Sequence, residues 1–146
     1  MSSTLPPIHK TYDPISLDRE YNARESVPSF QEEYDRYVEA SLRAKQTLKA
    51  QSDIVFDLKS GEKLDIYGAS SDNAPLFLWI HGGYWRSSSK EDNAFVALGL
   101  VPHDISVAIM NYTLAPTASL DEIVRQVRAA AEFLHGGSRS QKMAVS

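Results

Sequence analysis

The sequence predicts an α/β fold with a mostly parallel sheet. Two apolar runs, LFLWI at residues 76–80 and ISVAIMN at residues 105–111, have the continuous hydrophobicity of strands that are buried on both faces. Helical signals follow each run, and an order of strand, helix, strand and helix is typical of parallel pairing. Two alternating segments upstream predict a β-hairpin before these units.

The N-terminal segment has little hydrophobic pattern. Residues 1–28 hold four of the seven prolines and few branched aliphatic side chains, so we expect an extended arm before a domain of residues 29–146. Residues 29–51 predict an amphipathic helix with Ser29 as its N-cap. Its expected apolar face, which suits either the core or a homodimer interface, consists of Phe30, Tyr34, Tyr37, Val38, Ser41, Leu42, Lys45 and Leu48.

The remaining elements follow in order. Residues 53–58 alternate, with Ile54, Phe56 and Leu58 on one side, and residues 60–62 form the turn to a second strand at 63–67. Residues 92–100 predict a helix after the first apolar run. A longer helix at 120–135 ends at two glycines, and residues 142–146 resemble the opening of another strand.

Composition excludes several classes of function. Fifteen Lys and Arg against nineteen Asp and Glu give a net charge of −4, so no cationic field exists to bind nucleic acid or an anionic membrane. The absence of cysteine excludes disulfides and a thiolate nucleophile, and four scattered histidines do not suggest a metal site. With no signal peptide and no membrane-length apolar run, we expect a soluble protein, and the absence of cysteine fits a cytoplasmic one.

The first apolar run leads directly into His81, Gly82 and Gly83. Ligands of open α/β sheets bind at the carboxyl ends of the strands. Glycines at this point leave backbone N–H groups uncovered, as an oxyanion hole requires. Two glycines after a strand are also typical of an ordinary tight turn.

The surrounding residues favour the first interpretation. His-Gly-Gly after a third predicted strand is similar to the oxyanion loop of α/β-hydrolases, and the complete HGGYW segment resembles the HGGxW motif of arylformamidases, or kynurenine formamidases, and related esterases. The resemblance extends over nearly the whole chain. Its other parts are LDREYN at 17–22, VPSF at 27–30, NYTLAP at 111–116 and LDEI at 120–123.

The resemblance implies a role for each residue of the motif. The amides of Gly83 and Tyr84 would form the oxyanion hole, and Gly82 would set the turn. His81 would brace the loop rather than act as a base, and Trp85 would pack the loop against the body of the domain. We expect His9, His103 and His135 to be exposed, and we assign no role to them.

The nucleophile, acid and base histidine of an α/β-hydrolase are absent from the pattern. No G-x-S-x-G motif occurs, and Ser138 and Ser140 follow a helix rather than a strand. We therefore expect an N-terminal portion of an α/β-hydrolase fold that is incomplete before the nucleophile elbow. The resemblance implies that the strand at 76–80 lies between those at 105–111 and 142–146. Without a completed partner it would form an apolar edge prone to aggregation.

Several functions agree with these features. The resemblance implies hydrolysis of N-formylkynurenine in tryptophan catabolism, with a small formamide or acyl compound as substrate and no metal or organic cofactor. A carboxylesterase of the same family is an alternative, because HGGYW does not specify the leaving group. The features also agree with two binding functions, those of a catalytically inactive fragment that binds a partner and of an unrelated small α/β binding domain.

Overall fold

The computed structural model describes residue 6 and residues 8–137, and these form two units by their contacts. One unit lies within the first 36 residues, and the other begins at Tyr37. The expected boundary at residue 28 stays a prediction, and the strand expected at 142–146 lies outside the described residues.

The first unit contains a helix where the sequence predicts an extended arm. Helix α1 spans Pro14–Tyr21, and the Asp13 side chain caps it by accepting a hydrogen bond from the Ser16 amide at 2.8 Å. Proline at the first helical position is favourable, because its missing N–H needs no partner there. The expectation of an extended segment is therefore wrong for these residues, although α1 buries none of its side chains.

Helix α2 spans Phe30–Thr47, and Ser29 precedes it as predicted. The Ser29 hydroxyl accepts a hydrogen bond from the Glu32 amide at 3.3 Å. The predicted apolar face is buried less than expected, because only Ser41 and Ala44 are buried on this helix. Leu42 is on the predicted face but is 52% exposed.

The sheet contains four described strands in the order β1-β2-β4-β3. Strand β1 (Ala50–Val55) pairs antiparallel with β2 (Lys63–Tyr67), and β2 pairs antiparallel with β4 (Ser106–Met110). Strand β3 (Leu76–Ile80) pairs parallel with β4. The hairpin and the parallel pair are confirmed. Two of the three described pairings are antiparallel, so this part of the sheet is mixed and not mostly parallel as predicted. Strand β1 ends before Leu58, which is 94% exposed in the turn and does not continue the predicted alternation with Ile54 and Phe56.

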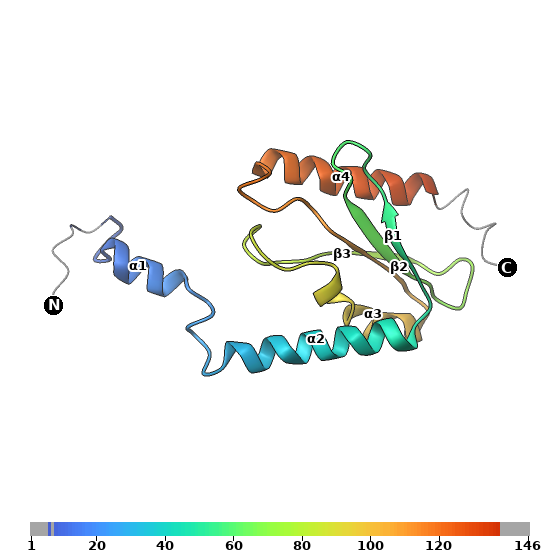
Figure 1. Cartoon of the computed structure of the whole chain (residues 1–146), viewed down its shortest axis with the longest axis horizontal. Helices are drawn as coiled ribbons and strands as arrows, with labels where there is room; N and C mark the ends of the chain where they lie inside the picture. The colour runs from blue at the N-terminus through green and yellow to red at the C-terminus, as the bar shows by residue number, and fades with distance from the viewer. Residues whose placement is uncertain (1–5, 7, 138–146) are drawn as a thin grey trace. The chain divides into compact units, whose positions relative to one another are not determined.

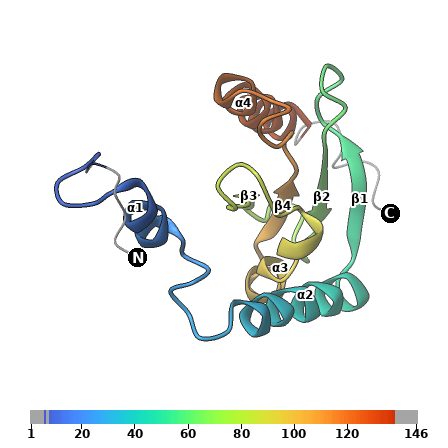
Figure 2. The ribbon, with the colours of Figure 1, turned by 60° about the vertical axis from the view of Figure 1, so that its left-hand side comes forward.

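Helices cover both faces of this sheet. The single helix predicted at 92–100 is instead a 3-10 turn (Glu91–Asn93), helix α3 (Val96–Leu100) and a second 3-10 turn (Val101–His103). The longer predicted helix is confirmed as α4 (Leu120–Gly137). Figures 1 and 2 show α4 on one side of the strands, with α3 and the C-terminal part of α2 on the other.

The alternation of β4 divides the hydrophobic core into two layers. Ala108 and Met110 pack with residues of α4, whereas Val107 and Ile109 pack with Ala97 of α3 and residues near it. All four of these β4 side chains are fully buried. The central strand therefore fulfils the prediction of a strand covered on both faces.

Strand β3 does not fulfil that prediction. Leu76, Phe77 and Ile80 are 39%, 42% and 44% exposed. The physical reason is position, because β3 pairs with β4 on one side and has no strand on the other among the described residues. The exposed apolar edge agrees with the sequence-based expectation. None of the described helices has both the length and the apolar character needed to cross a lipid bilayer.

Candidate functional site

The segment of residues 82–89, which we call the Gly83 loop, leaves the carboxyl end of β3. Gly83 has φ +116°, a conformation that side chains rarely adopt. A Cβ atom at this position would collide with the carbonyl group of Ser87, whose carbon would lie 2.8 Å away. Gly82 has no such constraint, since a Cβ there would meet nothing within 4 Å. Only the second glycine is required by the geometry.

The two residues after Gly83 continue the left-handed backbone. Tyr84 and Trp85 have φ +56° and +58°, which is unusual for bulky side chains and costs about 1–3 kcal/mol per residue. Strain of this kind persists where the surroundings hold the backbone, and it is common at functional sites. The Gly83 carbonyl accepts hydrogen bonds from the amides of Arg86 and Ser87 at 3.0 and 3.1 Å, which closes the loop on itself.

Free amides are the chemically useful feature of this loop. Among the described residues, neither the Gly83 amide nor the Tyr84 amide donates a hydrogen bond, and both residues are exposed. Backbone N–H groups held in a fixed loop and free of internal partners can stabilise a negatively charged oxygen. The loop therefore has the donors that an oxyanion hole needs.

His81 lies beneath the loop and is 3% exposed. Its Nδ1 lies 2.8 Å from the Gly82 carbonyl oxygen, so Nδ1 carries the proton and donates it. Burial lowers the pKa of His81 below 6.5, and this outweighs the opposite effects of the Gly82 carbonyl and nearby carboxylates. A neutral, buried imidazole suits the bracing role that the resemblance implies.

The loop is also attached to the segment that follows β4. The Tyr112 hydroxyl donates to the His81 carbonyl oxygen at 2.9 Å, and the Ala115 amide donates to the Trp85 carbonyl oxygen at 2.8 Å. The Trp85 ring is not packed into the body of the domain as expected, because the residue is 49% exposed and its ring contacts Tyr84. Its backbone makes the attachment instead.

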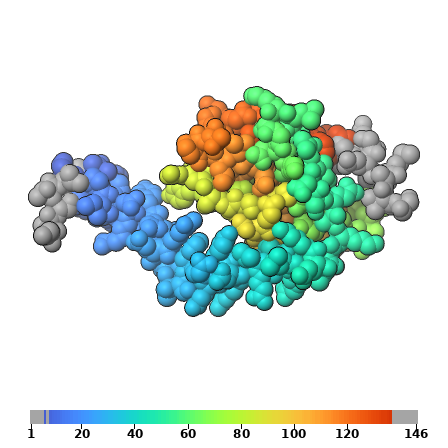
Figure 3. Space-filling view, in the orientation of Figure 1, coloured from blue at the N-terminus to red at the C-terminus, as the bar shows by residue number. Residues whose placement is uncertain are grey.

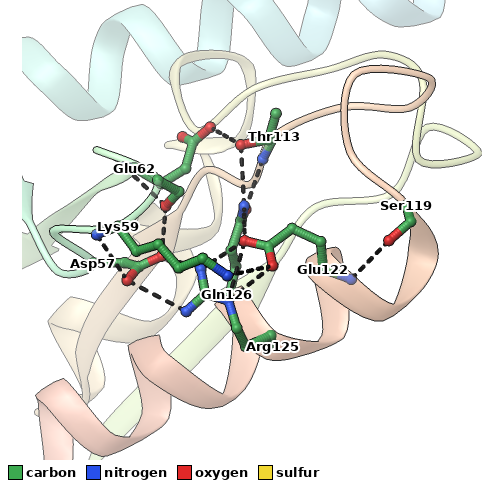
Figure 4. Close-up of polar contacts among 9 residues, drawn as sticks. Asp57, Lys59, Glu62, Thr113, Ser119, Glu122, Arg125 and Gln126 are labelled. Carbon is green, nitrogen blue, oxygen red and sulfur yellow. Dashed lines mark hydrogen bonds and ion pairs between the residues drawn. The ribbon is translucent and has the colours of Figure 1, made fainter.

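A polar network joins the segment that follows β4 to the hairpin and to α4 (Figure 4). The Thr113 amide donates to Gln126 Oε1 and its hydroxyl to Glu62 Oε1, both at 2.8 Å. Arg125 of α4 pairs with Asp57 in the hairpin turn and with Glu122. Figure 3 shows the hairpin against α4 at this place. These contacts hold the residues to which the Gly83 loop is bound.

Arg125 lowers the pKa values of both carboxyl groups. Its hydrogen bonds hold the pKa of Asp57 well below the usual 3.8, assisted by Ser60, and lower the pKa of Glu122 from 4.5 to about 2. Both groups are ionised at neutral pH. Nothing in this network is a metal site, since no three His, Asp or Glu side chains in the described part of the chain could hold an ion together.

Sequence reasoning located the loop but missed its supports. His9, His103 and His135 are exposed as expected. Tyr112 and Ala115 lie in the NYTLAP segment, which is part of the family resemblance. The sequence did not indicate that this segment contacts the loop. Lys90, the residue after the loop, is buried in the structure. The sequence did not predict this burial, because a lysine beside acidic residues is typical of a solvated surface.

The comparison with protein families decides the assignment. The BD-FAE family model matches residues 64–145, which is more than half of the sequence. The chain belongs to the BD-FAE family. The matched region includes the Gly83 loop, the NYTLAP segment and α4.

Kynurenine formamidases from three animals have sequences similar to this chain. Kynurenine formamidases from Danio rerio and Salmo salar are 38% and 36% identical over 88 and 92 residues, which is 59% and 62% of this chain. These alignments cover 30% and 31% of the relatives, so the chain matches about a third of their length. A Drosophila melanogaster kynurenine formamidase is 27% identical over 75% of this chain and 41% of its own length.

Solved structures share the fold of this BD-FAE member. A Silicibacter sp. TM1040 protein assigned as a thioesterase superposes with a TM-score of 0.73 at 23% identity, covering 80% of this chain and 45% of its own. The esterase LipW from Mycobacterium marinum gives a TM-score of 0.64 at 19% identity, covering 81% and 39%. The four strands and their helices are therefore an N-terminal portion of the α/β-hydrolase fold, as predicted.

Proposed function

We propose that this chain supplies the oxyanion-stabilising part of a serine-dependent hydrolase that acts on a formamide, with N-formylkynurenine as the substrate. The observation that carries the proposal is the left-handed backbone of Gly83, Tyr84 and Trp85 at the end of a parallel strand, where two amides have no described partner. The similarity to kynurenine formamidases favours a formamide over other acyl compounds.

The proposed chemistry divides into two acyl transfers. A serine oxygen attacks the formyl carbon, and the amides of Gly83 and Tyr84 stabilise the negative charge on the carbonyl oxygen. The tetrahedral species then releases the aromatic amine and leaves a formyl ester on the serine. Water hydrolyses the ester to formate and regenerates the hydroxyl group. None of these 146 residues is proposed as the nucleophile, as its base or as its acid.

The test begins with the protein from its natural source. We would measure its intact mass against 16.3 kDa, its labelling by a fluorophosphonate, and its hydrolysis of N-formylkynurenine and p-nitrophenyl acetate. A larger mass, with labelling and faster turnover of the formamide, would support the proposal. Labelling with turnover of the ester alone would favour a carboxylesterase.

The opposite result is equally clear. A mass near 16.3 kDa without fluorophosphonate labelling or turnover would contradict a hydrolase function for this product. That outcome would favour an inactive protein that binds a partner. Heat-denatured protein is the control for uncatalysed ester hydrolysis.

A further inference from the structure

Lys90 directly follows the Gly83 loop and is buried among carboxylates. Its side chain is 4% exposed, and its Nζ lies 2.7 Å from Glu91 Oε1, 2.9 Å from Asp65 Oδ1 and 3.3 Å from Asp53 Oδ1. Burial by itself would lower the pKa of Lys90, but hydrogen bonds to Glu91 and Asp65 outweigh it and raise the pKa. Lys90 is therefore a cation at neutral pH, held in a site where an unpaired charge would be costly.

A bulge in β1 provides one of these carboxylates. The pairing of β1 with β2 shifts between Gln51 and Ile54, and Asp53 within it has φ +58°. The Asp53 amide donates to Asp65 Oδ1 at 2.8 Å while its carboxylate faces Lys90. Bulges redirect side chains, and a left-handed aspartate costs free energy. The irregular backbone thus places the third of the three carboxylates beside the ammonium group.

The backbone of Lys90 is attached as well. Its amide donates to Asn111 Oδ1 at 2.7 Å, and the Asn111 amide donates to the Lys63 carbonyl oxygen at 2.9 Å. The main chain of Lys90 is therefore bound at the end of β4, and its side chain is bound to β1 and β2. The closing end of the Gly83 loop is held by three strands.

We propose that Lys90 is a positioning residue for the Gly83 loop, and that Asp65 and the bulged Asp53 are its anchors. The loop begins after β3, whose residues pair with β4, so fixing the far end of the loop limits the conformations open to the strained residues between. Lys90 would act through the loop and would not contact substrate. The inference rests on the proposed function, because it gives Lys90 a purpose in keeping the Gly83 and Tyr84 amides in place.

A purely structural role makes a different prediction. If Lys90 only neutralises the buried Asp65, its loss should destabilise the whole sheet, and removing the charge of Asp65 should correct every effect. If Lys90 holds the loop in place, its loss should increase the mobility of the loop more than that of the sheet. An uncharged residue at position 65 should then not restore the attachment of the loop.

Amide hydrogen exchange measured by NMR on the full chain separates these cases. The amides of Arg86 and Ser87, which donate to the Gly83 carbonyl oxygen, report on the loop, and amides of the β2 and β4 ladder report on the sheet. We expect Lys90→Met to accelerate exchange roughly tenfold more at the two loop amides than in the ladder. Equal acceleration at both places, or an unchanged loop, would overturn the proposal.

Two further variants complete the test. In the double variant Lys90→Met and Asp65→Asn, we expect the thermal midpoint to recover while the loop amides stay fast, and recovery of both would overturn the proposal. Asp53→Asn changes a side chain that is 62% exposed, so it should fold even if Lys90→Met does not. It should accelerate loop exchange roughly threefold, and no acceleration would count against an anchoring role.

The matched control is Arg36→Met. This arginine is 70% exposed and pairs with Glu33 on α2, so its loss should leave loop exchange unchanged. The measurement needs neither substrate nor nucleophile. Failure of the exchange test would therefore remove the role of Lys90 and leave the proposed hydrolase function to its own assay.

Discussion

Tyr112 contacts His81 in two ways at once. The two rings stack with their centroids 4.3 Å apart and their planes 14° from parallel, and the Tyr112 hydroxyl donates to the His81 carbonyl oxygen at 2.9 Å. The end of β3 is thereby joined to the segment after β4. The ring nitrogen Nε2 of His81 is buried and has no hydrogen-bond partner in the described structure, so a proton on this atom would be poorly accommodated.

We expect this histidine to make stability depend on pH. Because burial lowers its pKa in the folded state, the unfolded chain takes up a proton below about pH 6.5 while the folded chain does not. The free energy of unfolding should therefore fall as pH decreases below 6.5, by at most about 1.4 kcal/mol per pH unit. Urea denaturation between pH 7.5 and pH 5 measures this slope.

Substitution of His81 by Gln should reduce that slope, because the titrating group is gone. The matched control is His103→Gln, which changes an exposed histidine and should leave the slope as it is. An unchanged slope in His81→Gln would show that another group is responsible.

Gly83 should tolerate no side chain, whereas Gly82 should. Gly83→Ala places a Cβ against the Ser87 carbonyl group at φ +116°, and we expect a loss of about 2–4 kcal/mol in the free energy of unfolding. Gly82→Ala has open space at the same loop and should change stability by less than about 1 kcal/mol. Urea denaturation compares the pair, and equal losses would contradict the geometry.

The ion pair between Asp57 and Arg125 should make the stability of the protein depend on pH in the acid range. The folded-state pKa of Asp57 is well below 3.8 and that of Glu122 is about 2, so both contribute stability above their unfolded values. This stability is lost as pH falls from about 4.5 toward 2. We expect Arg125→Met to lower the urea midpoint at pH 7 and to lose less stability between pH 5 and pH 3 than the native chain.

The control for this experiment again changes an exposed cation. Lys59→Met removes one ion pair of Glu122 but leaves Arg125 in place. Because Lys59 lowers the Glu122 pKa less than Arg125 does, the acid profile of Lys59→Met should lie closer to the native profile than that of Arg125→Met. Parallel acid profiles for Arg125→Met and the native chain would contradict the assignment.

The exposed edge of β3 should govern self-association of the 146-residue chain. Phe77 is 42% exposed on a strand that has one described neighbour, and a charge on such an edge opposes pairing between molecules. Phe77→Lys should therefore raise the concentration at which light scattering detects association. Leu58→Lys adds the same charge at a turn residue that is 94% exposed, and it should have a smaller effect.

A monomeric native chain with a sharp, cooperative unfolding transition would contradict this expectation. It would show that the exposed apolar residues of β3 are not sufficient to cause association. The comparison between Phe77→Lys and Leu58→Lys separates the position of the charge from its effect on net charge.

The agreement between sequence and structure is best where the pattern is local. The apolar run at 105–111 and the amphipathic pattern at 120–135 predicted β4 and α4, because periodicity reports which side chains are buried. The periodicity is misleading at Leu58, because the strand ends before this residue. It is misleading again at residues 92–100, where short turns and α3 replace a continuous helix. Propensity over so few residues is weaker than the demands of packing.

The sequence by itself determined the α/β class, the hairpin and the position of the HGGYW loop. These follow from residues that are adjacent or regularly spaced, so no contact between distant segments is needed to find them. Only the tertiary structure decided that Gly83 is indispensable and Gly82 is not, and that Lys90 is buried against Asp53 and Asp65. Those features depend on the backbone path and on charges from separate strands, which residue order alone does not bring together.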